Sequence, residues 1–182
     1  MQLVKEIEIT SASVALDGRP VAVRDTGNKM LVELYRRYVG DYPKFFKMDT
    51  LCRLGFMAAE LLLDDCAADA VILANSSASI KNDTDYLTTI SDGNYYPSPA
   101  LFVYTLPNIV TGEIAIRHHI QGETSFYVLP SPELLNPIVE ATLKASSANV
   151  KSVLAGWCDC RAADDFFAKV GVWSNDKNYH HT

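Results

Sequence analysis

Apolar and polar residues follow two different periods along this chain. Between Leu3 and Ala12 apolar and charged positions alternate, which is typical of a strand with one buried face. A Gly-Arg-Pro turn is expected at 18–20 and a short helix at 28–37. The clearest helix is predicted from Lys47 to Asp64, where apolar residues recur at helical spacing. The run from Asp69 to Ala74 is short, apolar and bounded by polar residues, which predicts a strand buried on both faces of a parallel sheet.

The second part of the chain continues to alternate between helix and strand patterns. Its segments are a polar turn and short helix over 76–87, a loop over 92–99, a helix-compatible stretch over 100–120 that Pro107 interrupts, a strand over 124–128, a helix from Ser131 to about Ser146, and a strand over 152–157. Strands that alternate with helices predict an α/β fold in which helices flank a sheet. The polar segment 175–182 is expected to be a disordered tail.

Length and charge narrow the class of protein. The 182 residues fit a single domain, 1–182, and the net charge is -6. Diffuse acidity argues against nucleic-acid binding, because a protein that binds phosphates needs a basic face. The first ten residues contain Lys5, Glu6 and Glu8 and do not form a signal peptide, and no apolar run reaches the length of a membrane span. We therefore expect a cytoplasmic protein.

Four cysteines are the residues most able to suggest a metal site or a disulfide. Cys52 and Cys66 lie in helical, apolar surroundings, whereas Cys158 and Cys160 form a C-x-C pair. A zinc site would need a second pair, which the sequence lacks. The chain also lacks nucleotide-binding and metalloprotease motifs. We expect reduced, buried thiols, no metal and no cofactor.

Several segments, in the same order, resemble the N-terminal half of the β-ketoacyl synthase (3-oxoacyl-acyl-carrier-protein synthase) family. Phe46-Lys-Met-Asp49 is similar to the start of the helix before the family's second core strand. The sequence VILANSSAS at 71–79 matches a strand that ends in a Gly/Ser-rich turn. The stretch from Pro97 to Ile116 follows the family's pattern of Pro, aromatic residues and Asn-x-x-(Ala/Thr)-Gly-x-(Ile/Leu)-Ala, and Ile120-Gln-Gly122 then leads into a strand. The resemblance covers roughly residues 45 to 160.

The resemblance implies half of a thiolase-like fold, with a mixed sheet of about five strands flanked by helices. It also implies a dimer interface. In the family the strand equivalent to 124–128 pairs with its counterpart across a two-fold axis, and here that strand consists of Thr124, Ser125, Phe126, Tyr127 and Val128. This segment carries none of the charges or prolines that protect free sheet edges. A single half-fold would also expose the layer that the other half covers, so we expect oligomerisation.

The chain departs from the family at the nucleophile. Alignment from Gly122 places Ser131, between two prolines, where the family has its catalytic Cys. A thiolate gains from a helix N-terminus, whereas a serine needs an adjacent general base. Ser131 is better interpreted as a helix N-cap, and its replacement by Ala is then expected to cost about 1 kcal/mol of stability. The chain is also about half the length of a full synthase, whose second half carries the catalytic histidines.

Other candidates for catalysis are weaker. His118 and His119 are adjacent near a helix end, so they cannot both face one site, and exposed cations that favour the helix C-terminus are the simpler interpretation. His180 and His181 lie in the polar tail. The acidic pairs at 64–65 and 164–165 have no third ligand nearby and are expected to be solvated surface. We expect no catalytic residue for condensation.

These observations favour a non-condensing partner protein that resembles the chain-length-factor subunits of fatty acid, polyketide or aryl-polyene biosynthesis. Its expected partners are a full-length ketosynthase, an acyl carrier protein, or both. One alternative is a small acyl-transferring or thioester-hydrolysing enzyme that uses Ser131. Another is a half-synthase that a second chain completes, and a stand-alone module that binds carrier protein is a third.

Overall fold

One mixed sheet organises the protein. The computed structural model describes residues 1–145, 150–176 and 179. Within these residues seven strands form the sheet: β1 (Gln2–Thr10), β2 (Val14–Leu16), β3 (Arg19–Val21), β4 (Ala70–Asn75), β7 (Thr124–Val128), β8 (Ser152–Ala162) and β9 (Asp165–Ser174). The strand order is β3-β2-β1-β9-β8-β4-β7. The predicted mixed sheet is confirmed, with seven strands in place of about five.

The strands differ in direction. β4 pairs in parallel with both β7 and β8, whereas β9 runs antiparallel to β8 on one side and to β1 on the other. β9 therefore joins the N-terminal strands to the parallel part of the sheet. The carboxyl ends of β4, β7 and β8 all lie at the same edge of the sheet because these strands are parallel.

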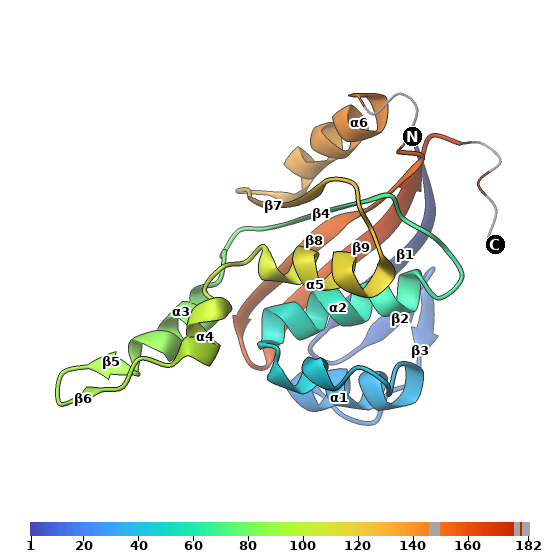
Figure 1. The fold of residues 1–182 in the computed structure, drawn as a ribbon. Coiled ribbons are helices and arrows are strands. Elements are labelled where there is room, and N and C mark those ends of the chain that lie inside the picture. Colours follow the sequence, from blue (N-terminus) through green and yellow to red (C-terminus); the bar gives the residue numbers. More distant parts are fainter. Residues whose placement is uncertain (146–149, 177–178, 180–182) are drawn as a thin grey trace.

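Helices from the first part of the chain and α5 cover one face of the sheet (Figure 1). They are α1 (Gly27–Tyr38), the short 3-10 helix η1 (Pro43–Lys47), α2 (Thr50–Leu62) and α5 (Ile109–His118). α2 lies directly on the sheet and is buried along almost its whole length. Gly55 allows α2 and α5 to approach each other closely, because a β-carbon there would collide with the side chain of Val110 in α5. The largest apolar core lies on this face.

The opposite face carries α6 (Leu135–Ala145), preceded by the 3-10 helix η2 (Pro132–Leu134). Leu135, Val139 and Leu143 recur every fourth residue of α6 and pack on β4 and β8. This explains why every residue of β4 is buried, as its continuous apolar sequence predicted. Over β1 the same face is charged, because Glu6 and Glu8 alternate with residues that point into the core.

A small projection extends from the body at the lower left of Figure 1. It comprises α3 (Ile80–Leu87), the strands β5 (Ile90–Ser91) and β6 (Asn94–Tyr95), and α4 (Pro99–Val103). The predicted loop over 92–99 thus contains part of a hairpin, whose turn uses Gly93 at a φ of 84°. Tyr95 and Tyr96 are 73% and 79% exposed.

Most of the predicted elements are confirmed, and three predictions were wrong. The Gly-Arg-Pro turn at 18–20 is displaced: Asp17 and Gly18 make the turn at φ values of 49° and 72°, and Arg19 and Pro20 belong to β3. A proline is tolerated there because β3 is an edge strand. The last predicted strand does not end at Trp157, since β8 continues to Ala162.

The third concerns β9, a strand in a segment for which the sequence analysis predicted no element. Its sequence, DFFAKVGVWS, alternates buried and exposed positions over its first six residues. Phe166, Ala168 and Val170 point into the core, while Phe167 and Lys169 point to the opposite face. This period of two was a readable strand signal.

The predicted tail 175–182 is described only at 175, 176 and 179. There the Nδ2 atom of Asn175 donates to the carbonyl of Leu143 at 3.1 Å, and the Tyr179 hydroxyl accepts from the N–H of Ala67 at 3.0 Å. The remaining residues of this segment, including His180 and His181, lie outside the described residues.

Two glycines allow the packing of the sheet to be tested. A β-carbon at Gly156 of β8 would collide with the backbone of Lys169 and Val170 in β9, so Gly156→Ala is expected to lower the free energy of unfolding by about 2 kcal/mol. Gly112 in α5 has open space where a β-carbon would be added, so Gly112→Ala is expected to raise it by about 1 kcal/mol. Urea unfolding of both variants measures these changes. Equal effects of the two substitutions would contradict the close β8–β9 contact.

Candidate functional site

The carboxyl edge of the parallel strands brings together residues from three parts of the chain. Ser76 and Ser77 follow β4, Ser131 follows β7 after a short link, and Asp159 and Arg161 lie near the end of β8. In α/β sheets, ligands usually bind at this edge. This edge is therefore the candidate functional site.

Ser131 lies where the sequence predicted, immediately before the helical segment. Its backbone is extended, with φ of -153° and ψ of 153°, and it precedes η2 and then α6. The predicted capping bond is wrong, because the Ser131 side chain makes no hydrogen bond to the helix backbone. The Ser131 hydroxyl instead interacts with the carboxylate of Glu133 and lowers the pKa of Glu133. The stability cost expected for loss of an N-cap therefore has no structural basis.

The surroundings of Ser131 do not supply a general base. The pKa of Glu133 is held below its ordinary value, mainly by the Ser131 hydroxyl, so this carboxylate is a weak proton acceptor. Among the described residues both histidines belong to the end of α5, which packs on the opposite face of the sheet from α6. A serine in this environment keeps its proton.

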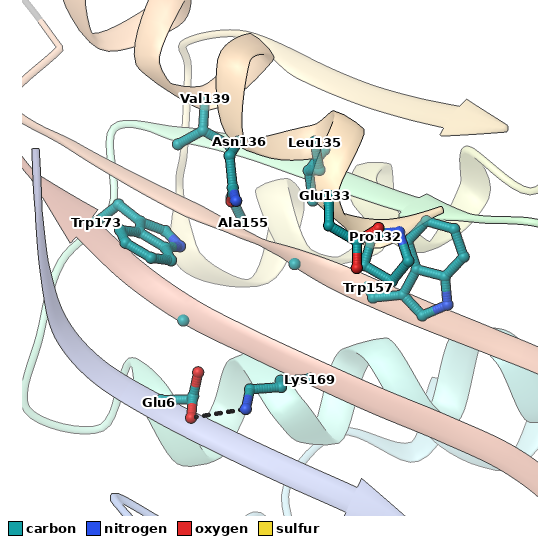
Figure 2. A pocket seen from close by; sticks show the side chains of 12 residues that line it. Glu6, Pro132, Glu133, Leu135, Asn136, Val139, Ala155, Trp157, Lys169 and Trp173 are labelled. Carbon is teal, nitrogen blue, oxygen red and sulfur yellow. Dashed lines mark ion pairs between the residues drawn. The ribbon is translucent and has the colours of Figure 1, made fainter. Parts of the chain in front are cut away.

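A groove of about 240 Å³ lies beside Ser131, between the start of α6 and the sheet (Figure 2). Pro132, Glu133 and the α6 residues line one wall, and Trp157 and Trp173 lie toward opposite ends of the groove. Ser131 itself does not line the groove. The groove could not be predicted from the sequence, because its walls come from β1, β8, β9 and α6, which only the sheet order brings together.

Asp159 is the most buried charged residue at this edge, with 8% of its surface exposed. Its two carboxylate oxygens accept hydrogen bonds from Ser76, at 3.0 Å, and from Ser77. Arg161 approaches the same carboxylate at 3.9 Å. These bonds satisfy the carboxylate and fix the turn after β4, where Ala78 adopts a φ of 50°. Asp159 was not predicted as a site residue, since its only local signal was a polar position between Cys158 and Cys160.

The four cysteines are all free and buried, as predicted. Burial raises the pKa of Cys160 to about 12 and that of Cys66 to about 11, and it raises the pKa of Cys52 and Cys158 well above the ordinary value. The thiols therefore remain protonated, and a protonated thiol is neither a nucleophile nor a metal ligand.

The histidine prediction was half wrong. His119 ends α5 in the left-handed conformation at a φ of 55° and is exposed. His118 is not an exposed cation, because its Nε2 atom lies 2.9 Å from Glu60 Oε1 and only 19% of its side chain is exposed. Arg117 also binds Glu60, at 3.1 Å, and it reaches Asp41 at 3.0 Å. This network holds α5 against α2.

Within the part of the chain that the structure describes, no group of three or more His, Cys, Asp or Glu side chains is arranged to hold a metal ion. None of the helices described is both long enough and apolar enough to span a membrane. The acidic pair at 64–65 is not wholly solvated surface, since Asp65 lies 2.5 Å from the buried Lys5.

The predicted interface strand, Thr124–Val128, forms β7 with the predicted bounds and lies at the edge of the sheet. The N–H of Leu129 donates to the carbonyl of Asn75 in β4 at 2.8 Å, and the carbonyl of Glu123 accepts from the N–H of Val71 at 2.8 Å. In a parallel ladder the backbone groups of alternate residues point to the same side, so the N–H groups of Phe126 and Val128 point away from β4. β7 therefore offers hydrogen-bonding groups along a free edge, and its role as an interface stays a prediction.

Comparisons with known proteins identify the fold. No protein-family model and no curated protein matches the chain. A chain of the ketosynthase (ApeO) in complex with its chain length factor (ApeC) from Xenorhabdus doucetiae is similar, with a TM-score of 0.67 and 11% identity over 97% of this chain and 79% of that chain. A chain of the ishigamide ketosynthase/chain length factor gives a TM-score of 0.64 and 19% identity over 80% of this chain and 49% of that chain. The predicted thiolase-like α/β fold is confirmed.

Asp49, part of the segment that resembles the start of a ketosynthase helix, caps α2. Its Oδ1 atom accepts the N–H of Cys52 at 2.8 Å. Burial raises the pKa of Asp49 to about 6. Because the folded-state pKa is raised, the folded state binds this proton more tightly than the unfolded state does. The stability contributed by protonation is present below about pH 4 and is lost as the pH rises through 6.

The variant Asp49→Asn removes this titration but keeps a good N-cap. The wild type is expected to lose stability as Asp49 deprotonates between about pH 5 and pH 7, whereas the variant does not. The stability of the variant relative to the wild type should therefore rise by about 1 kcal/mol over this pH range. Urea unfolding at both pH values measures it. Asp92→Asn in the exposed β5–β6 turn controls for the loss of one carboxylate. A difference for Asp49→Asn that does not change with pH would show that its carboxyl group is not perturbed.

Proposed function

We propose that this chain is a non-condensing, chain-length-factor-like partner of a β-ketoacyl synthase in fatty acid, polyketide or aryl-polyene biosynthesis. It pairs with a full-length ketosynthase in the cytoplasm, and the assembled pair receives chains from an acyl carrier protein. The fold shared with the ketosynthase and chain length factor complexes supports this proposal.

The observation that carries the proposal is the state of Ser131. It occupies the slot that the resemblance assigns to the catalytic Cys, between β7 and α6, yet the carboxylate beside its hydroxyl, that of Glu133, has a lowered pKa, and no described histidine lies near it. Thiolate chemistry cannot be transferred to the protein's own cysteines, because burial keeps all four protonated. A pseudoenzyme partner fits these facts better than a condensing enzyme does.

The alternative in which Ser131 transfers or hydrolyses acyl groups has less support. A serine that hydrolyses thioesters needs a general base beside it and hydrogen-bond donors placed to bind the oxyanion. Here the carboxylate that Ser131 contacts, Glu133, is exposed and has a lowered pKa. The half-synthase alternative is compatible with the same partner chain but requires that chain to supply the nucleophile.

The purified chain is expected not to decarboxylate malonyl-carrier protein. Carbon dioxide release is measured against a heat-treated sample, and a rate above that background would contradict the proposal. Ser131→Cys is also expected to be inactive, because no described histidine lies near the slot. Intact-mass analysis after iodoacetamide is expected to show one adduct on Ser131→Cys and none on the wild type, whose thiols are buried. An acyl adduct on the wild type that disappears in Ser131→Ala would favour the hydrolase alternative.

The assembly prediction uses the free edge of β7. Val128 is 55% exposed and its N–H points away from β4, so Val128→Pro removes an outward donor without opening the β4–β7 ladder. The variant is expected to weaken dimer formation by roughly tenfold or more in analytical ultracentrifugation. Val128→Thr keeps the N–H and is expected to assemble like the wild type.

Phe126 is less suitable for this test, because its side chain packs against the core. A wild-type chain that stays monomeric at tens of micromolar, both alone and with a co-expressed ketosynthase, would contradict the interface. Dimers of Val128→Pro as tight as those of the wild type would do the same.

A further inference from the structure

The net charge of this chain conceals an uneven distribution. Residues 19–53 hold eight of the 16 basic residues and four of the 22 acidic residues, which gives this segment a net charge of +4. The remainder of the chain has a net charge of -10. The acidity that the composition suggested is therefore not diffuse.

The basic residues of this segment differ from the others in their pairing. Of its eight cations only Lys44 has a carboxylate within 4 Å among the described residues, at 2.5 Å from Glu113. Outside the segment the described cations are paired with carboxylates, with Lys151 as the exception. The paired cations are Lys5, Lys81, Arg117, Lys144, Arg161 and Lys169.

Four of the unpaired cations surround one groove on the outer side of α1. Lys29, Arg36, Arg37 and Arg53 line it together with Asp25 and Glu33, and its volume is about 600 Å³. Arg24 and Arg37 line an adjoining hollow. We call this surface, made of Arg24, Lys29, Arg36, Arg37 and Arg53, the α1 basic surface.

The two carboxylates at the α1 basic surface do not neutralise it. Glu33 accepts the backbone N–H groups of Arg24 and Asp25, at 2.9 and 3.0 Å, and these bonds hold its pKa below the ordinary value. The Glu33 carboxylate therefore stabilises the loop before α1 through these two backbone hydrogen bonds. With five cations against Asp25 and Glu33, the surface keeps a positive charge at every pH near neutrality.

We propose that the α1 basic surface is a docking site for an acidic segment of a partner protein. These cations form no ion pair with a described residue, whereas complementary charge on a partner accelerates and orients association. Lys29 and Arg36 stand seven residues apart on the same helix, which corresponds to about 10 Å along its axis. Carboxylates repeated along a facing helix match that spacing.

The geometry favours an extended acidic segment over a single small anion. A phosphate site needs several free donors that converge on one point. Here Arg53 already donates to the carbonyls of Phe45, at 3.2 Å, and Phe46, at 2.9 Å, and Arg37 donates to the carbonyl of Ala22 at 2.9 Å. The positive groups are thus held apart along the groove.

This docking site is separate from the interface strand. α1 packs against α2 beside the β1–β3 edge, while β7 forms the other edge of the sheet (Figure 1). A partner at α1 therefore leaves β7 free, and the proposal does not depend on the proposed function.

The test uses the full chain and a fluorescein-labelled, helical peptide of about 20 residues with Glu repeated at every third or fourth position. Fluorescence anisotropy at about 50 mM salt is expected to show binding that weakens as salt increases. The double variant Lys29→Glu/Arg36→Glu is expected to lose roughly tenfold or more in affinity. Neither side chain makes a hydrogen bond or ion pair with a described residue, so thermal unfolding is expected to be unchanged.

Lys151→Glu is the matched control, since Lys151 is exposed and lacks a carboxylate partner among the described residues but lies on the approach to β8. Its affinity for the peptide is expected to stay within about twofold of that of the wild type. Equal loss of affinity in Lys151→Glu would overturn the proposal. So would tighter binding of a DNA duplex than of the peptide, or displacement of the peptide by inorganic phosphate beyond the effect of chloride at equal ionic strength.

Discussion

The two parts of the sheet are held together by β9. This strand is hydrogen-bonded to β8 on one side and to β1 on the other, so it links the N-terminal hairpins to the parallel strands. Gly156 permits the backbones of β8 and β9 to approach closely. The inward side chains of β9, including Ala168 and Val170, then complete the core beneath α2. Without this strand β1 would have no neighbour that connects it to β4 and β7.

Burial under these helices also governs the chemistry of the titratable groups. The thiols of Cys158 and Cys160 are buried, and burial raises their pKa and makes them unreactive. The buried Glu113 is stabilised by its ion pair with Lys44, and the partly buried Glu60 by its ion pair with Arg117. The same condition explains Asp159, which is buried but satisfied by two hydroxyl groups. These groups stabilise the fold.

Two surfaces of the described part of the chain combine exposure with hydrogen-bonding or charged groups that have no partner in it. One is the edge of β7, where backbone donors point away from the sheet. The other is the α1 basic surface, where charges lack partners. The first offers backbone hydrogen bonds and suits a strand, whereas the second offers spaced cations and suits an acidic segment. They lie at different edges of one sheet, so a single molecule of this chain has room for two partners.

Local elements and the class of fold could be predicted without any coordinates. The helical spacing over 47–64 and the apolar run at 69–74 predicted α2 and β4 because periodicity reflects which side of an element is buried. The position of Ser131 and the strand at 124–128 could also be found, since both lie shortly after Gly122 in the sequence. The site could not: Ser76 and Asp159 are 83 residues apart, and their contact exists only because β8 pairs with β4. That Lys29 and Arg36 have no carboxylate partner among the described residues likewise depends on distances between elements, and those distances follow from how the helices and strands pack.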